Sequence, residues 1–533
     1  MEKQENYHSK VPHYNFSNTL QKQLEELKKN DLLNRMKTVR YNNNDPYRPF
    51  YHYVNPEGNL NDPNGLCFWK DQWHLFYQAY PPEDPRQHWG HAISKDLIHW
   101  EDLPYAIYPD PEECCFSGTT LVEKNRVIAM YHGTKVGNMI AVSSDHLLLN
   151  WKKIGDGAVI PFPDQIENVK YSVFDPCIWK KGNKYYSLSG GTLPNGPNNK
   201  QIRANFLFSS DNLVQWKYLH EFIENDFYSL VGDDGACPYF WPIGDKYILL
   251  FYSHMSGGQY LVCDYEKNRD KFVVFNGGKF NFSSSNPCGI HASSATPDGE
   301  EGIIVLFNMN PGLPTQGWNQ IMSLPRKLQL DKYNELKMEP TGDIQSLRYD
   351  HQHIENKFIR ANQEMTIEGI KGNTLELNLE IDPKDSNLVE VNVLRSTNKE
   401  EFTRIIFFKD RGNHNRFHIP NRTALQANSP LLKNIPSRKE SLLTIDTSFS
   451  SILPKALSRA PETAPVHLHD QETLNLRIFI DRSVLEVFIN NKQCVSVRVY
   501  PSLTDSLGVS LNARGNDAKL LKLDAWKMKN IYR

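Results

Sequence analysis

The sequence predicts an all-β protein, a five-bladed β-propeller followed by a C-terminal β-sandwich, with a short N-terminal helical extension. Three observations lead to this fold class. Residues 50–335 contain short apolar and aromatic runs between turn residues, without a long helical pattern. A motif of Ser or Asp, then Leu, then Trp recurs at residues 94–100, 144–151 and 210–216. From Phe358 onward, apolar and polar residues alternate, as they do in half-buried strands.

Shifts in composition suggest four segments. The expected bounds are 1–48 for the N-terminal extension, 49–335 for the propeller, 336–355 for a polar linker and 356–533 for the sandwich. In the extension, Leu20, Leu24 and Leu27 recur at helical spacing, with Ser17 or Asn18 as the N-cap. They predict one amphipathic helix, whose apolar face packs on the main domain or on a second copy of the chain in a homodimer.

The repeated motif organises the predicted propeller. Each copy ends in a tryptophan that should begin an outer strand. Hairpins are expected beside the copies, at residues 65–78, 119–133, 176–190, 238–253 and 302–309. About five such units of strands fit a propeller, because radial repetition leaves few exposed sheet edges. A sandwich of similar length is the alternative.

The C-terminal region reads as an antiparallel sandwich. Residues 374–381, 474–481 and 484–489 alternate apolar with polar side chains, so one face of each strand is buried and the other is wet. Asn490 and Asn491 favour a hairpin turn before the strand at 494–500.

Composition argues against several classes of partner. Lys and Arg number 60 and Asp and Glu 62, so no net field favours nucleic acid or an anionic membrane. No apolar run approaches the roughly 18 residues that span a bilayer, and residues 1–6 lack the apolar core of a signal peptide. The eight cysteines form no CxxC motif, which predicts neither a disulfide framework nor a zinc site. We expect a cytoplasmic protein.

Carboxylates recur just ahead of the predicted hairpins. Asp62 and Asp175 each precede a proline at the start of a hairpin, and Asp233 and Asp234 precede a third. Equivalent positions on the blades of a propeller point toward one axial funnel, so these groups should converge. Glycosyl transfer needs one carboxylate facing the anomeric carbon and a protonated acid at the leaving oxygen. Crowding of like charges helps to keep such an acid protonated. Ordinary turn chemistry is the alternative for any single aspartate.

An ordered series of motifs resembles that of family 32 glycoside hydrolases. The propeller region contributes Asn-Asp-Pro-Asn-Gly at 61–65, Phe-Tyr-Gln at 76–78, Trp-Gly-His-Ala at 89–92, Phe-Ser-Gly at 116–118 and Phe-Asp-Pro at 174–176. Gly-Trp at 317–318, Ser-Leu-Pro-Arg at 323–326 and the segment 476–488 extend the match. This family contains invertases, inulinases, levanases and fructosyltransferases, and its fold is a five-bladed propeller with a β-sandwich.

The resemblance implies a retaining mechanism on β-fructofuranosyl units of sucrose, fructo-oligosaccharides or fructans. Asp62 matches the nucleophile and Asp175 matches the aspartate that stabilises the transition state. The positions that match the fructosyl pocket are Asn61, Gln78, Trp89, Phe116 and Ser117. No metal or organic cofactor is implied, and the expected partner is a small sugar or oligosaccharide.

Two residues depart from the family pattern. Phe174 stands where the family usually has Arg, and Ala236 stands before Cys237-Pro238 where the family has its acid/base Glu. An alanine cannot transfer a proton. Three explanations are open: an engineered replacement that traps substrate, an acid moved to another residue, or a catalytically inactive sugar-binding protein.

A relocated acid is the favoured explanation. Asp234 stands as far before Trp241 as Asp62 stands before Trp69, so Asp234 is expected to occupy a similar blade position and to serve as the acid. Asp233 beside it is expected to contact the substrate, or to supply the proton in place of Asp234. The prediction is a retaining fructofuranosidase, with a binding protein and a fructosyltransferase as alternatives.

Overall fold

The computed structural model describes residues 8–163, 170–194, 196–412, 440–469 and 472–532. It divides into two compact units, residues 1–347 with 529–533, and residues 348–528. Each unit is described by itself. The polar residues 1–6 lie outside the described part of the chain.

Five antiparallel sheets make up most of the first unit within the described residues. The first holds β1 (Asn59–Trp69), β2 (Gln72–Tyr80), β3 (His88–Ser94) and β4 (Trp100–Ile107). The second holds β5 (Cys115–Glu123), β6 (Arg126–Gly133), β7 (Gly137–Ser143), β8 (Lys152–Lys153) and β9 (Ile160–Pro161). The third holds β10 (Pro176–Lys181), β11 (Lys184–Leu193), β12 (Ile202–Ser210) and β13 (Lys217–Glu221), with the short η2 (Pro197–Asn199) between β11 and β12.

The fourth and fifth sheets complete this set. The fourth holds β15 (Ala236–Ile243), β16 (Lys246–Ser253), β17 (Gly257–Glu266) and β18 (Lys271–Lys279), to which β14 (Ile223–Glu224) adds in parallel. The fifth holds β19 (Ile290–Pro297), β20 (Ile303–Met309), β21 (Ile321–Met322), β22 (Arg326–Leu330) and β23 (Leu336–Pro340), followed by η3 (Ile344–Leu347).

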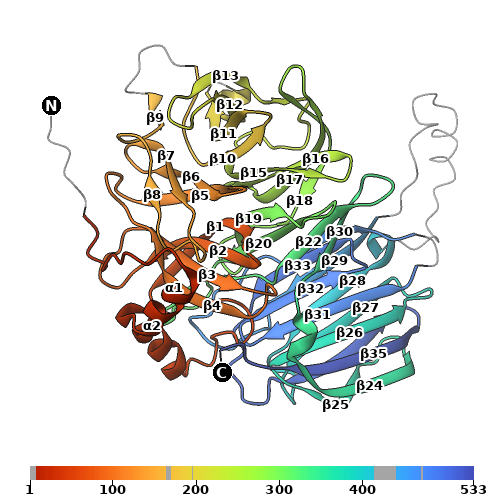
Figure 1. Ribbon diagram of the computed structural model, residues 1–533. Coiled ribbons are helices and arrows are strands. Elements are labelled where there is room, and N and C mark those ends of the chain that lie inside the picture. The colour runs from red at the N-terminus through yellow and green to blue at the C-terminus, as the bar shows by residue number, and fades with distance from the viewer. Residues whose placement is uncertain (1–7, 164–169, 195, 413–439, 470–471, 533) are drawn as a thin grey trace, which may run out of the picture. The chain divides into compact units, whose positions relative to one another are not determined.

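The first strands of the five sheets form a ring. β1 contacts β5 and β19, β5 contacts β10, β10 contacts β15, and β15 contacts β19, which returns to β1. Figure 1 shows the sheets fanning out from these strands as the blades of a propeller. The predicted five-bladed propeller is confirmed, and it brings the starts of β1, β5, β10, β15 and β19 toward one axis.

The repeated motif has one backbone geometry in three blades. Leu97, Leu148 and Leu213 all adopt a left-handed conformation, with φ of 70°, 52° and 68°. An Asp or Asn side chain ahead of each leucine accepts backbone N–H groups of the turn, as Asp96 does from Ile98 and His99. These hydrogen bonds offset the cost of the left-handed residue.

Two details of the predicted organisation differ from the structure. The segment 302–309 contains the single strand β20 (Ile303–Met309), which pairs with β19, rather than a hairpin. The expected linker at 336–355 contains β23 of the fifth blade and most of β24 of the second unit. Both strands are partly exposed, so their polar side chains resemble those of a loop.

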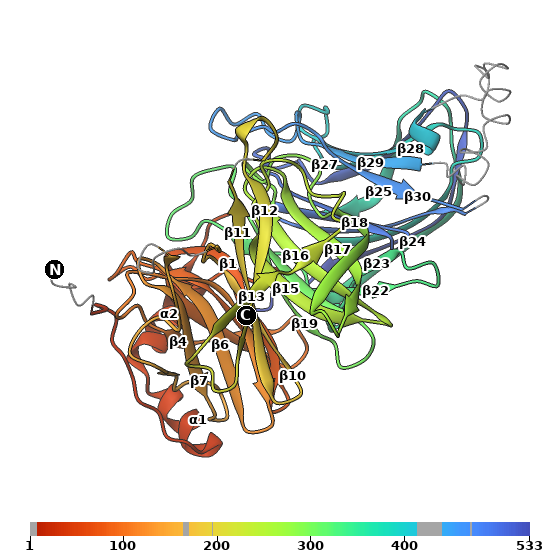
Figure 2. The same ribbon diagram turned by 90° about the horizontal axis from the view of Figure 1, so that it is seen from above.

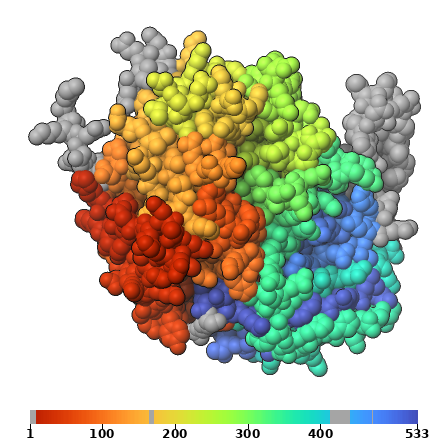
Figure 3. Space-filling view, viewed as in Figure 1, coloured from red at the N-terminus to blue at the C-terminus, as the bar shows by residue number. Residues whose placement is uncertain are grey.

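The N-terminal extension contains two helices within its described residues, α1 (Leu20–Lys28) and α2 (Asp31–Asn42), instead of one. The side chain of Asn30 accepts the N–H of Leu33 at 3.0 Å and so starts a second helix. Leu27 and Leu33 pack with Ile93 of the first blade, and Figure 3 shows the helical segment covering the side of that blade. The expected packing on the main domain is therefore confirmed.

The second unit is the predicted antiparallel sandwich, and Figure 2 shows its two sheets as layers. One sheet has the order β24 (Arg348–Ile359), β35 (Ala518–Met528), β26 (Thr374–Asp382), β31 (Leu474–Asp481), β32 (Val484–Ile489), β33 (Gln493–Arg498). The other has the order β25 (Met365–Lys371), β34 (Gly508–Arg514), β27 (Leu388–Arg395), β28 (Thr403–Phe408), β29 (Glu440–Asp446), β30 (Glu462–His467), with η4 (Lys409–Gly412) after β28.

The turn between β32 and β33 has the expected chemistry. Asn490 and Asn491 both have positive φ, 49° and 52°, which asparagine tolerates better than most residues. All eight cysteines are free thiols. Among the described residues, no helix is both long and apolar enough to cross a bilayer.

Candidate active site

The inner strands of three blades bring Asp62, Asp175 and Ala236 to corresponding positions. Asp62 lies in a bulge of β1 opposite Gln78, and Ala236 pairs with Tyr252. Asp175 faces the equivalent residue of β11, whose N–H it accepts through its backbone carbonyl at 2.9 Å. Counted from the hairpin turns, the three residues are equivalent. Two of these positions carry a carboxylate, and the third carries only a methyl group.

This register corrects the position expected for Asp234. Trp69 is the last residue of β1, beside the turn, whereas Trp241 lies inside β15. The two tryptophans are therefore not equivalent reference points, and the expected equivalence of Asp234 with Asp62 is wrong. Asp234 lies in the loop that precedes β15.

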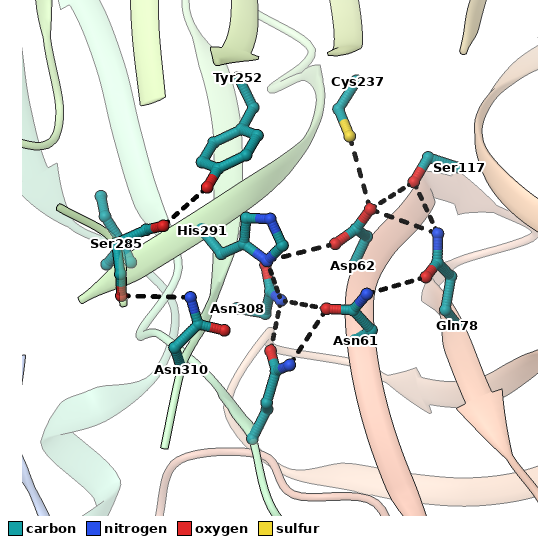
Figure 4. Close-up of polar contacts among 12 residues, drawn as sticks. Asn61, Asp62, Gln78, Ser117, Cys237, Tyr252, Ser285, His291, Asn308 and Asn310 are labelled. Carbon is teal, nitrogen blue, oxygen red and sulfur yellow. Dashed lines mark hydrogen bonds and ion pairs between the residues drawn. The ribbon is translucent and has the colours of Figure 1, made fainter. Parts of the chain in front are cut away.

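The two oxygens of Asp62 have different surroundings. Oδ2 accepts from Ser117 Oγ at 2.6 Å, Gln78 Nε2 at 3.3 Å and, weakly, Cys237 Sγ at 3.6 Å (Figure 4). Within the described residues Oδ1 has no hydrogen-bond partner, although Nδ1 of His291 lies 3.6 Å away. The donors on Oδ2 orient the carboxylate and leave Oδ1 for a ligand.

Asn61 and Gln78 belong to a network of amides behind this carboxylate. Asn61 Nδ2 donates to Gln78 Oε1 at 3.1 Å, and Asn61 Oδ1 accepts from Asn308 at 3.2 Å and from Gln320 at 3.1 Å (Figure 4). The network joins the first and fifth blades. Because each amide is oriented by the next, the Gln78 group that faces Asp62 is held in one orientation.

Asp175 meets the same thiol as Asp62. Its Oδ2 accepts from the backbone N–H of Cys237 at 2.9 Å and from Cys237 Sγ at 3.5 Å. Cys237 has a φ of 50°, a strained value for a side chain with a Cβ, which lets both its N–H and its thiol reach the carboxylates. Burial, and then the charge of Asp62, raise the pKa of Asp175 to about 7.

Trp89 and Phe116 differ in how far they are exposed. Trp89 has no exposed surface, and its Nε1 donates to the carbonyl of Phe116 at 2.9 Å. It supports the wall of the site from behind. Phe116 is partly exposed beside Ser117 at the start of β5, where a ligand can reach it.

Ala236 sits in a small apolar cluster. Its methyl group is buried with Cys237, Tyr252 and Ala292, and Phe174 packs against them. The two residues that depart from the motif series thus lie together, and the ring of Phe174 packs against the cluster that holds the methyl group of Ala236.

Asp233 and Asp234 have separate environments. Asp233 is fully buried, and its carboxylate accepts from Ser253, Ser256, Gln259 and the N–H of Leu230. Four donors from its own blade make it an anchor of the loop, without a free oxygen for substrate or proton transfer. Asp234 is partly exposed and binds His254, whose Nδ1 lies 2.7 Å from Oδ2 and whose N–H lies 3.2 Å from Oδ1.

Two histidines were missed by sequence reasoning. His254 follows β16 and His291 lies at the start of β19, and the Tyr252 ring packs against both, with centroids 5.2 and 4.3 Å away. The hydrogen bond to Asp234 raises the pKa of His254, with smaller contributions from Asp175 and Asp62. Burial lowers the pKa of His291. A search for histidines flanking the predicted hairpin ends could have marked both.

Together these residues form a carboxylate site at the propeller axis. One aspartate is oriented by hydroxyl, amide and thiol donors, a second carboxyl has a raised pKa, and a histidine with a raised pKa stands nearby. Two convergent carboxyl groups, one with a raised pKa and the other with an oxygen open to a ligand, are the equipment of a glycoside hydrolase.

The chain belongs to glycosyl hydrolase family 32. Residues 52–340 match the model of the family's N-terminal domain, and residues 343–527 match that of its C-terminal domain. It is 26% identical to a levanase of Bacillus subtilis, over 91% of this chain and 71% of that protein. It is 27% identical to a fructan 6-exohydrolase of Beta vulgaris, over 92% of this chain and 88% of that protein.

Solved structures share the fold. The crystal structure of fructan 1-exohydrolase IIa from Cichorium intybus superposes with a TM-score of 0.76 at 21% identity, covering 91% of this chain and 98% of that one. The sucrose-6-phosphate hydrolase of Lactobacillus gasseri superposes with a TM-score of 0.71 at 21% identity, covering 95% and 98%. The family membership and the fold expected from the motifs are confirmed, and the chain is a glycosidase.

Proposed function

We propose that this protein is a retaining β-fructofuranosidase that removes terminal β-fructofuranosyl units from sucrose, fructo-oligosaccharides or fructans. The observation that carries the proposal is the asymmetry of Asp62: among the described residues, Oδ2 accepts from three donors and Oδ1 from none. Family membership and relatives named for levan, fructan and sucrose derivatives support the fructofuranosyl unit as the group transferred.

In the first half of the reaction, Oδ1 of Asp62 attacks C2 of the fructosyl ring. The bond from C2 to the leaving oxygen breaks, and that oxygen takes a proton from an acid. The result is a fructosyl ester of Asp62. In the second half, water attacks C2 and gives a proton back to the same group, and the ester bond breaks, so that fructose leaves with its configuration retained.

Other residues assist at fixed places. Ser117 and Gln78 stabilise Oδ2 of Asp62 as negative charge returns to it when the ester breaks. Asp175, held by the N–H of Cys237, is placed to interact with a bound sugar through its second oxygen, which has no hydrogen-bond partner within the described residues. Eight free thiols fit a reducing compartment, and we include a cytoplasmic location in the proposal.

The test is release of fructose from sucrose, sucrose 6-phosphate, inulin and levan, with Asp62→Ala as the inactive reference. The anomer formed first is read by NMR, and the β-anomer is expected. Binding of these sugars without turnover would support the sugar-binding alternative. Oligosaccharide products in place of free fructose would support a fructosyltransferase. Turnover that survives in Asp62→Ala would remove Asp62 from the mechanism.

A further inference from the structure

The proposed hydrolysis lacks its proton donor at the position where the family carries one, because Ala236 cannot supply a proton. The described residues around Asp62 and Asp175 offer few replacements. The two carboxylate oxygens of Asp233 already accept hydrogen bonds from four donors. Asp234 is engaged through both oxygens by His254. His291 is held neutral by burial, which lowers its pKa.

We propose that His254, oriented by Asp234, replaces the missing glutamate as general acid and base, a role that rests on the fructosidase activity proposed above. His254 belongs to the blade that carries Ala236, and it follows the strand whose Tyr252 pairs with Ala236. It lies at the edge of the site, because its ring centroid is 6.2 Å from that of His291, whose Nδ1 is 3.6 Å from Asp62.

The geometry assigns a role to each group of the pair. Asp234 Oδ2 holds Nδ1 of His254, which leaves Nε2 as the nitrogen that faces other partners. A carboxylate behind a histidine fixes the tautomer and favours the imidazolium. The side chain of His254 is 57% exposed, so a leaving sugar that projects from the site can reach it. Asp234 is thus a positioning residue, and His254 is the group that contacts the substrate.

The proton balance closes with these two residues. In the first step, the Nε2 proton of the imidazolium passes to the leaving oxygen as its bond to C2 breaks and Asp62 bonds to C2. In the second step, neutral Nε2 takes a proton from water as the water oxygen bonds to C2 and the ester breaks. His254 returns to the imidazolium, and no other reactant is required.

The test compares leaving groups that need an acid with one that does not. Nitrophenol leaves without protonation, so kcat/KM for 4-nitrophenyl β-fructofuranoside depends on Asp62 and not on the acid. The kcat/KM for sucrose depends on both. His254→Gln should lower kcat/KM for sucrose by about 10²–10⁴-fold and leave kcat/KM for the nitrophenyl fructoside within several-fold of the parent. Loss of the base slows hydrolysis of the fructosyl ester and so lowers kcat for the nitrophenyl substrate. Azide, which needs no base, should raise this kcat again and yield a β-fructosyl azide.

A matched control lies in the first blade. Asp96 holds His99 by the same two contacts, Nδ1 at 2.7 Å and N–H at 2.8 Å. His99→Gln therefore removes a similar pair and should leave kcat/KM for both substrates unchanged. Asp234→Asn should keep part of the sucrose activity and shift the alkaline limb of its pH profile to lower pH. If His254 had only a structural role, His254→Gln would instead lower kcat/KM for both substrates together.

The outcomes separate this inference from the proposed function. A parent that hydrolyses both substrates, with His254→Gln unchanged on sucrose, overturns only the role of His254. A parent that hydrolyses only the nitrophenyl substrate, with sucrose activity appearing in Ala236→Glu, also overturns the role of His254. That result would show that the acid has been lost at position 236. A parent inactive on every furanoside, and unresponsive to Ala236→Glu, overturns the proposed function itself.

A second cluster of side chains lies in the other unit and carries an independent inference. His351 and His353 project from the same face of the edge strand β24, and Asp524 of β35 pairs with His353 across the sheet. His351 Nε2 and His353 Nδ1 lie 2.9 and 2.8 Å from the same oxygen, Oδ1 of Asp524. Lys522 holds the other oxygen at 2.7 Å, and Trp526 stacks on His351.

We infer that these three residues bind a divalent cation of the zinc, nickel or cobalt type. Metal bonds of about 2.0–2.1 Å place neighbouring donor atoms about 3.0–3.4 Å apart in right-angled to tetrahedral geometry. The two nitrogens lie 2.9 and 2.8 Å from the carboxylate oxygen, and all three atoms lie within 4.8 Å of one another. Two imidazoles and one carboxylate on one side of an ion leave its other positions to water. Trp526 and Lys522 pre-orient two of the donors, so little ordering remains for the ion to impose.

Calorimetric titration of the full chain, stripped with EDTA, with zinc, nickel and magnesium chlorides tests this site. One zinc or nickel ion should bind per chain, and magnesium should not. His351→Asn with His353→Asn should lower the zinc affinity at least tenfold, whereas His220→Asn, on an outer strand of the propeller, should not. Zinc binding unchanged in the double variant, or none in the parent, would overturn the inference.

Discussion

Ser117 donates its hydroxyl proton to Oδ2 of Asp62 across 2.6 Å, the shortest of the three contacts this oxygen makes. The bond crosses from the second blade to the first. It couples the orientation of the nucleophile to the closure of the ring, because neither blade alone presents Asp62 with all its donors.

Removing this hydroxyl should therefore weaken catalysis more than stability. A hydrogen bond to a charged group contributes about 1.5–3 kcal/mol, so Ser117→Ala should lower kcat/KM for sucrose by about 10–100-fold. Ser187→Ala is a control, since Ser187 is also buried but donates to a backbone carbonyl in the third blade. Steady-state kinetics beside thermal unfolding would contradict the prediction if both variants lost activity equally.

The raised pKa of Asp175 predicts a pH-dependent gain in stability on its removal. An acid whose folded pKa, here about 7, exceeds its unfolded value favours the folded state only when protonated. The contribution is complete below about pH 4 and is lost as pH rises to about 7. Asp175→Asn should therefore match the parent near pH 4 and exceed it at pH 8 by on the order of 4 kcal/mol.

Urea unfolding of both proteins at several pH values measures this difference. Asp62 supplies part of the shift, so the gain should shrink in an Asp62→Asn background. The gain should come with loss of turnover, as expected of a charge kept at a site for function. A difference between Asp175→Asn and the parent that is independent of pH would contradict the prediction.

The propeller was predictable because its signals are local. Turn formers before each hairpin and the motif that ends in Trp100, Trp151 and Trp216 recur along the chain, and each encodes one turn with one backbone geometry. Asp62 and Asp175 were predictable for the same reason, since each lies within a short ordered motif. The residues that were misplaced or missed depend instead on strand register and on contacts that form only in the fold.

His254 illustrates that limit. In the sequence it is one histidine after an apolar strand, and its meaning comes from Asp234, twenty residues earlier, and from the neighbouring blade. Asp234 was marked by counting from a tryptophan, but the hairpin turn sets the register and a bulge shifts it. Asn30 marked a helix start that the leucine spacing concealed.

Asp233 should prove important for stability and dispensable in the chemistry. Its four donors come from one loop and one hairpin of the fourth blade. Asp233→Asn turns one acceptor into a donor that faces other donors, and should lower the free energy of unfolding by about 2–4 kcal/mol. The kcat/KM of the folded fraction, measured well below the melting midpoint, should stay within several-fold of the parent. A specific loss of sucrose activity with normal stability would instead restore Asp233 as an acid.

Arg40 should anchor the N-terminal helices to the first blade. Its guanidinium binds both oxygens of Asp102, at 2.8 and 2.6 Å, and lies 4.0 Å from the ring centroid of Tyr532 near the C-terminus. Both partners of the pair are nearly buried. Arg40→Met leaves the buried carboxylate of Asp102 with the hydroxyl of Tyr53 but without its cation, and should cost about 3–5 kcal/mol of unfolding free energy. Adding Asp102→Asn should recover much of that loss, because the buried charge is then gone.

The exposed pair of Arg269 and Glu224 is the control, and Arg269→Met should leave the unfolding midpoint almost unchanged. If the double variant were no more stable than Arg40→Met in urea unfolding, the cost would lie in packing against Tyr532 rather than in the stranded charge.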